Sequence, residues 1–147
     1  MNDINLTILV GKLGNDPKEV VIDTVKHPHA INTKAVKFRL FTKKYKKNKD
    51  DDKTTITTET HKIKAFSQNA IYSLEKLKKD SRILVIGEIH YHSYKLTDGT
   101  FGENTEIIAQ HIIDFKQDKK LIKEKLMTLV ESNEISADTL EKVLSLI

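Results

Sequence analysis

Lysine, arginine and aromatic side chains alternate with apolar ones in two segments, residues 35–45 and 60–66. Alternation with a period of two places the two sets on opposite faces of a strand. Cations interleaved with flat rings are the groups that hold a phosphate chain while its bases stack. A solvated sheet face is the alternative, since exposed lysines also protect strand edges from aggregation. The residues on the polar face that could do this chemistry are Lys37, Arg39, Lys43, Tyr45, Thr60, Lys62, Lys64 and Phe66.

Other kinds of site are poorly supported. His90 and His92 have the H-x-H spacing of a metal site, but the sequence shows no carboxylate or thiol companion for them, so we expect no metal. There is no recognisable Ser/His/Asp constellation and no glycine-rich phosphate loop of the nucleotide-hydrolysing type. The sequence therefore predicts a binding protein without a cofactor and not an enzyme.

Five strands and one helix are expected to position these side chains. Besides the two alternating segments, residues 5–13, 82–94 and 105–115 have strand patterns, and residues 67–80 have helical spacing with Ser67 as a candidate N-cap. Residues 46–58 are predicted to be a mobile projecting loop, and residues 95–104 a long hairpin tip. A helix between the third and fourth of five strands is the chain order of the five-stranded Greek-key OB barrel, an all-β fold.

The end of the chain has a different pattern from the barrel. Residues 119–132 and 134–147 each carry apolar side chains at helical spacing, and Ser136 or Asp138 could cap the second helix. Neither helix could bury its apolar stripe alone, which suggests a helical hairpin. We therefore expect an OB-fold domain over residues 1–116 and a helical appendage over residues 117–147, packed locally or used in oligomer contacts.

Charge and composition narrow the class of partner. The 147 residues are 38% hydrophobic and carry a net charge of +4, and the excess of cations lies before Asp118. This balance permits a polyanion partner. The chain has no cysteine, so it offers neither disulfides nor thiolate metal sites. No membrane-spanning run and no signal peptide are recognisable, and the expected location is the cytoplasm, in association with the nucleoid.

Short motifs accompany this order of elements. LTILVGKLGNDP (residues 6–17) contains V-G-x-L-G-x-D-P, AVKFRLFT begins at Ala35, ETHKIKAFSQNA spans residues 59–70 and LVIGEIHYHSYKLTDGT spans residues 84–100. In this order and spacing, over residues 5–115, they resemble the bacterial single-stranded-DNA-binding protein family of homo-oligomeric OB folds. The resemblance implies sequence-independent binding and protection of single-stranded DNA during replication, recombination or repair. It also implies a homo-oligomer, with a tetramer favoured over a dimer.

The resemblance assigns roles to individual residues. The family stacks bases on a few aromatic side chains, mostly tryptophans, and these positions fall here on Tyr45, Phe66 and Tyr94, while a fourth falls on Thr60. Stacking contributes about 1–3 kcal/mol per base, and smaller rings lie low in that range. The chain has no tryptophan, so weaker binding per site is implied. His90 and His92 are expected along the strand that faces DNA. The phosphate contacts would come from Lys37, Arg39, Lys43, Lys62 and Lys64.

The helical tail departs from the family. Its members usually end in a flexible linker and an acidic, hydrophobic tip that recruits replication and repair enzymes, whereas this chain ends in KVLSLI without an acid cluster. The resemblance therefore does not extend to the usual route to such partners, and an accessory or mobile-element paralogue fits at least as well as a housekeeping protein. The alternative function is an OB adaptor that assembles a protein complex, with weak or vestigial nucleic-acid binding.

Overall fold

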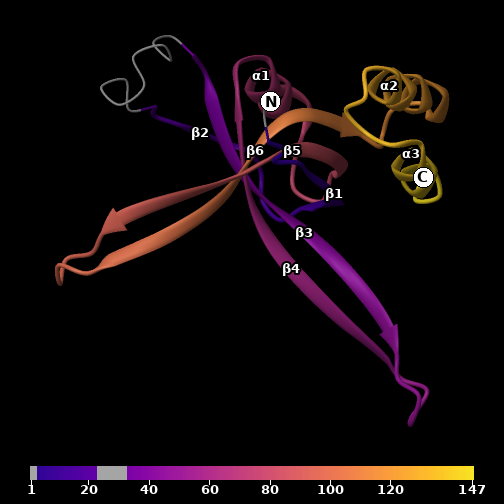
Figure 1. Cartoon of the computed structure of the whole chain (residues 1–147), viewed down its shortest axis with the longest axis horizontal. Helices are drawn as coiled ribbons and strands as arrows, with labels where there is room; N and C mark the ends of the chain where they lie inside the picture. The colour runs from indigo at the N-terminus through magenta and orange to yellow at the C-terminus, as the bar shows by residue number, and fades with distance from the viewer. Residues whose placement is uncertain (1–2, 23–32) are drawn as a thin grey trace.

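Two long hairpin arms diverge from a small barrel, one toward the lower left and one toward the lower right of the view, and two helices lie against the barrel at the end of the chain (Figure 1). The computed structural model describes residues 3–22 and 33–147. Its strands are β1 (Thr7–Leu13), β2 (Lys18–Val20), β3 (Ala35–Lys47), β4 (Thr54–Phe66), β5 (Arg82–Lys95) and β6 (Phe101–Asp114). Its helices are α1 (Ser67–Lys76), α2 (Lys119–Glu131) and α3 (Ala137–Leu144).

Five of these strands close into a barrel. Antiparallel pairs join β1 to β5, β5 to β6, β3 to β4 and β1 to β3, and a short parallel pairing of β4 with β6 completes the ring. Gly11 permits the closure, because a Cβ atom there would lie 2.1 Å from the carbonyl oxygen of Phe41 on β3. Helix α1 lies between the third and fourth barrel strands in chain order. The predicted OB fold is therefore confirmed, with β2 as a short addition paired to β3.

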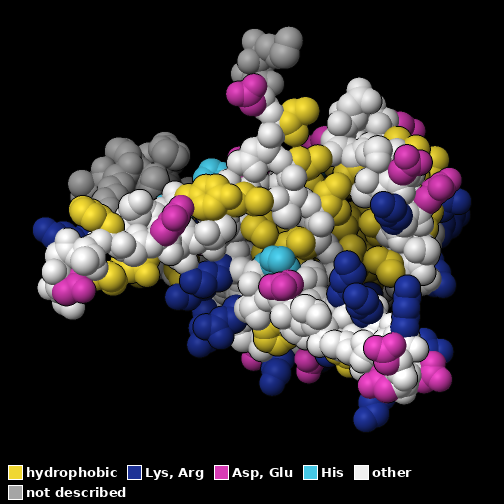
Figure 2. Space-filling model, turned by 60° about the horizontal axis from the view of Figure 1, so that its bottom comes forward, with side chains coloured by type: hydrophobic (Ala, Val, Ile, Leu, Met, Phe, Trp, Pro, Cys, Tyr) yellow, Lys and Arg dark blue, Asp and Glu magenta, His cyan; other side chains and the backbone are white. Residues whose placement is uncertain are grey.

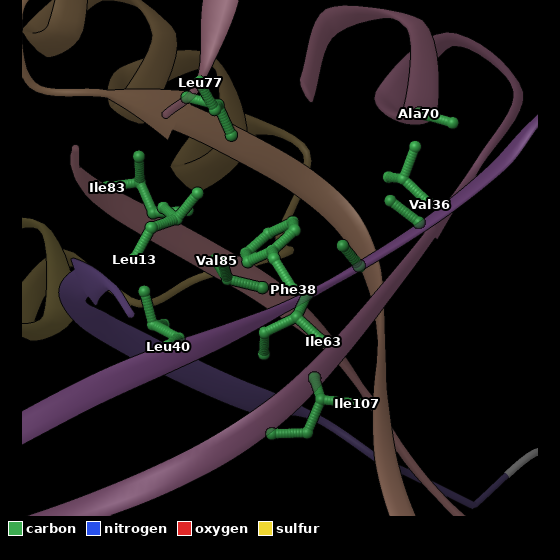
Figure 3. Close-up of a cluster of buried hydrophobic side chains, with 12 residues drawn as sticks. Leu13, Val36, Phe38, Leu40, Ile63, Ala70, Leu77, Ile83, Val85 and Ile107 are labelled. Carbon is green, nitrogen blue, oxygen red and sulfur yellow. The ribbon is translucent and has the colours of Figure 1, made fainter. Parts of the chain in front are cut away.

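The barrel core follows the alternation seen in the sequence. Val36, Phe38 and Leu40 are buried, whereas Lys37 and Arg39 between them are exposed. Figure 3 shows these three apolar side chains from β3 meeting others from β1, β4, β5, β6 and α1. Because this face is apolar, the cationic face must point outward.

The arms are longer than the sequence indicated. Strands β3 and β4 pair without interruption to Lys47 and Thr54, so the loop predicted over residues 46–58 is wrong except for residues 48–53. Strands β5 and β6 pair to Lys95 and Phe101, and residues 96–100 alone form the tip. Once past the barrel a hairpin has no buried face, and it therefore loses the apolar alternation by which strands are recognised.

The tail helices build a second apolar core on the outside of the barrel. Ile122, Leu126 and Leu129 of α2 and Val143 of α3 pack with Leu84, Ile86 and Ile113 of β5 and β6, and Ile8 and Val10 of β1 lie against them. No helix in the described part of the chain is long and apolar enough to cross a membrane.

The N-termini of the helices confirm the capping prediction for α3 and show that the one for α1 is wrong. Ser136 caps α3 by accepting a hydrogen bond from the backbone N–H of Thr139, and Asp118 caps α2 by accepting one from the backbone N–H of Lys120. Ser67 does not cap α1. It has φ = +54° and makes no capping hydrogen bond, and Phe66 is the N-cap residue.

Candidate nucleic-acid interface

The outer face of β3 and β4 carries four cations that the sheet register places directly opposite one another. Lys37 is paired with Lys64 and Arg39 with Lys62, and direct antiparallel partners project from the same face. The four side chains line a groove of about 590 Å³. Within residues 3–22 and 33–147 none of them forms an ion pair. Like charges directly across a ladder are destabilising, and no ion pair with another described residue offsets that repulsion on this face.

The view in Figure 2 shows lysine and arginine side chains gathered between the two arms, near the base of the arm formed by β5 and β6. Further cations follow the other arm, and acidic side chains mark its tip. Lys43 lies on this second arm, opposite Thr58. The positive charge therefore extends from the groove along β3.

Sequence reasoning did not single out the other residues of the groove. Lys18 of β2 adds a fifth cation, and Asn15 accepts a hydrogen bond from the backbone N–H of Arg39 at 2.8 Å. From β6 come Asn104, whose Oδ1 accepts from Lys62 Nζ at 2.6 Å, and Glu106, the carboxylate that lines the groove. Nothing in the sequence pointed to these contributions, because β2 and β6 meet the groove only after the barrel has closed.

The three predicted stacking residues lie around the groove and not together inside it. Phe66 is half-buried at the end of β4, with Lys64 Nζ 5.6 Å from the centre of its ring. Tyr45 is 64% exposed on the long arm, opposite Ile56. Phe66 is paired with Ala35, and the ten residue steps along β3 from Ala35 to Tyr45 correspond to about 33 Å. A nucleic-acid strand that contacted both Phe66 and Tyr45 would therefore have to cross the whole cationic face.

Tyr94 lies on the β5–β6 arm, and its ring packs against Gly102. It is paired with Gly102, and a Cβ atom at that position would lie 2.5 Å from the tyrosine ring. The ring therefore rests across the backbone of β6 and keeps about half of its surface exposed (49%). Asn104, two residues from Gly102, touches Lys62, so the outer face of this arm is continuous with the cationic groove.

Thr60, His90 and His92 also face outward, with different surroundings. Thr60, on which the resemblance placed a fourth stacking position without a ring, is exposed opposite Phe41. His90 Nε2 lies 3.1 Å from Glu88 Oε2, and His92 Nε2 lies 3.5 Å from Glu106 Oε1. Each histidine thus has the carboxylate partner that the sequence did not reveal. In the described part of the chain no group of three or more His, Cys, Asp or Glu side chains is placed to hold a metal ion.

Comparison with known proteins identifies the family to which the barrel belongs. The model of the Single-strand binding protein family matches residues 4–115. The chain belongs to this family. Curated relatives named single-stranded DNA-binding protein include one from Xanthomonas axonopodis pv. citri (strain 306), 34% identical over 109 residues, and one from Xylella fastidiosa (strain Temecula1 / ATCC 700964), 35% identical over 109 residues.

The matches cover only part of this chain and only part of the relatives. The alignments cover 74% of this chain but 56% and 62% of the two relatives, so the chain spans about three fifths of their length. Among solved structures, the Plasmodium falciparum SSB complex with ssDNA superposes with a TM-score of 0.64, covering 78% of this chain and 97% of the other at 21% sequence identity. This likeness supports the OB fold. The family match ends at Phe115, so α2 and α3 lie outside it.

Proposed function

We propose that the protein binds single-stranded DNA without sequence preference and protects it during replication, recombination or repair, with no enzymatic step and no cofactor. The observation that carries this proposal is the face on which Lys37, Arg39, Lys62 and Lys64 are opposed in pairs without acidic partners among the described residues. A phosphate backbone supplies the missing negative charge. Binding then releases counterions, and affinity falls with salt.

Stacking is the second part of the proposed mechanism. A strand lying in the groove would place bases against Phe66 at one end and would reach Tyr94 or Tyr45 on the arms. All three rings keep exposed surface, and a ring accepts any base because every base has a π face. Lys43 contributes a further phosphate contact on the way to Tyr45, and Thr60, His90 and His92 line the same outward surface.

The proposal includes how the chain is organised and assembled. We assign strand binding to residues 1–116, and we propose that residues 117–147 are an appendage whose helices support the barrel. A homo-oligomer is proposed, with a tetramer favoured over a dimer. Support comes from the outer edge of β1, where the described residues Thr7–Val10 pair with β5 on one side only, and from Leu6 beside it, which is 45% exposed. The proposed location is the cytoplasm, at the nucleoid, and replication or repair proteins would have to be recruited by a surface other than an acidic tip.

Two sets of substitutions test stacking and charge separately. Changing Tyr45, Phe66 and Tyr94 together to Ala should weaken binding of fluorescent oligo-dT strongly without changing the slope of log K against log[salt]. Changing Lys37 and Lys62 to Gln should lower that slope by about 1.4, at about 0.7 for each phosphate that is no longer neutralised. The matched control is Tyr91→Ala with Phe101→Ala, since these exposed rings lie on the opposite face of the β5–β6 arm.

The same variants separate the proposal from the adaptor alternative. If the triple aromatic variant loses oligo-dT binding but still supports cell growth and DNA repair, the barrel serves as an adaptor whose DNA binding is vestigial. Oligo-dT affinity that none of the site substitutions changes would contradict the proposed interface. Light scattering with and without oligo-dT measures the assembly state in the same samples.

A further inference from the structure

A second cationic hollow lies at the end of the barrel, where β5 begins and α2 starts. It has a volume of about 350 Å³, and its lining includes Arg82, Lys116 and Lys119 together with the half-buried ring of Phe115 and the apolar residues Leu146 and Ile147. Asp80 is the acidic side chain that lines it. Lys116 and Lys119 come from the segment beyond the family match, so this hollow combines the barrel with the tail that follows the matched region.

Strand register connects this hollow to the main groove. Lys12 of β1 is the direct partner of Phe41 on one side and of Arg82 on the other, at the point where the barrel closes. Because direct antiparallel partners share a face, Phe41, Lys12 and Arg82 all project outward. Phe41 follows Arg39 by two residues on the outer face of β3, next to the groove. The path from Arg39 across Phe41 and Lys12 to Arg82 is about 16 Å long at ordinary strand spacings.

The charges along this path have no partners within the protein as far as it is described. Lys12, Arg82, Lys116 and Lys119 are exposed, and none of them appears in an ion pair with another described residue. Lys12 and Arg82 are like charges directly opposite each other on paired strands, the same unfavourable arrangement as in the main groove. A run of uncompensated cations that crosses three strands favours a polyanion that follows it.

An aromatic ring lies between the two sets of cations. Phe41 packs against Gly14, where a Cβ atom would lie 2.4 Å from the ring, and it is only half-buried. A cation–aromatic–cation order is therefore present on this path, as it is along β3 and β4. Cations that flank an aromatic ring can contact the phosphates of a single strand while the ring stacks one of its bases. A small anion would need the cations but not the ring.

We propose that a single strand bound in the main groove continues over Phe41 and Lys12 into the second hollow, where Arg82 and Lys119 hold its phosphates. The inference rests on the proposed function, because the occupant is the same strand. The tail then has a role in binding, since it supplies the far wall of this extension. A short oligonucleotide fills the main groove alone, whereas a longer one also occupies the hollow.

Oligonucleotide length provides the test. The double variant Arg82→Gln/Lys119→Gln and the control Lys76→Gln/Lys125→Gln remove the same amount of charge, and the control lysines line neither hollow. Fluorescent oligo-dT of about 6 and about 16 nucleotides spans the usual range of site sizes for one OB fold. We expect the double variant to bind the longer oligonucleotide about tenfold more weakly, with a salt slope lower by about 1.4, and to bind the shorter one as the wild type does. The control variant should bind both oligonucleotides with the affinity of the wild type.

Each other outcome has a defined meaning. Equal weakening on both lengths, equal weakening in the control, or no change on the longer oligonucleotide would overturn the extension while leaving the main groove intact. A wild-type protein that binds neither oligonucleotide would contradict the proposed function itself. Circular dichroism melting checks that the variants fold, and Lys12→Gln/Lys119→Gln repeats the test without altering Arg82.

Discussion

The tail helices should be part of the cooperative fold, and a single leucine tests this. Leu126 of α2 is fully buried (0% exposed) in the core that α2 and α3 share with β5 and β6. Replacing a buried leucine by alanine removes its transfer free energy and leaves a cavity, at a cost of about 2–5 kcal/mol. Leu121 on the same helix is 43% exposed, and the same substitution there should change the free energy of unfolding by less than about 0.5 kcal/mol.

Urea denaturation measures both variants. Circular dichroism measures the loss of strands and helices, and tyrosine fluorescence measures the change in the surroundings of the tyrosine rings. With an m-value of about 2 kcal/mol/M, the Leu126→Ala variant should unfold at a urea concentration about 1–2.5 M lower than the wild type, in one transition by both probes. A shared core is refuted if α2 and α3 unfold first and leave the barrel midpoint unchanged. It is equally refuted if Leu121→Ala and Leu126→Ala behave alike.

Three further predictions concern the interface and the tail. Thr60→Trp should restore a stacking ring, strengthen oligo-dT binding by about 1–3 kcal/mol and give a tryptophan signal that DNA quenches; an unquenched tryptophan would place this position away from DNA. Phe66→Leu should weaken binding by about 1–3 kcal/mol for each base that no longer stacks, with an unchanged salt slope, as measured by fluorescence titration at several salt concentrations. Hydrogen bonds from Ser132 and then His111 lower the pKa of Glu134, so its carboxylate stabilises the fold above its usual pKa, and this contribution disappears as pH falls through the lowered value. Glu134→Gln should therefore be less stable than the wild type near pH 7, and thermal melting should show the difference disappearing in strong acid; a difference that persists there would contradict this role for the carboxylate.

The barrel was predictable because its strands have one buried face. Val36, Phe38 and Leu40 alternate with Lys37 and Arg39, and this pattern predicted both the strand and the direction of its cations. The ends of the arms had no such signal. Residues 54–58 are threonines around one isoleucine and are exposed throughout, so their pairing with β3 depends on the hairpin and not on burial.

The outward position of the cations was predictable, but the full lining of the groove was not. Cations and rings on β3 and β4 could be predicted from period-two alternation. The roles of Lys18, Asn104 and Glu106 could not, because they depend on which strands meet when β4 pairs with β6. The same limit applies to Lys12 and Arg82, which are far apart in the sequence and become direct partners only in the sheet.

The most direct test of the proposed interface is a comparison of single-stranded and duplex DNA across a salt series. Fluorescent oligo-dT of about 16 nucleotides and a duplex of the same length are titrated with the full chain. We predict tighter binding of the single strand, with log K falling linearly with log[salt] at about 0.7 for each phosphate contacted. Equal affinity for both, or binding that does not change with salt, would contradict the claim that the opposed cations and exposed rings form a single-strand interface.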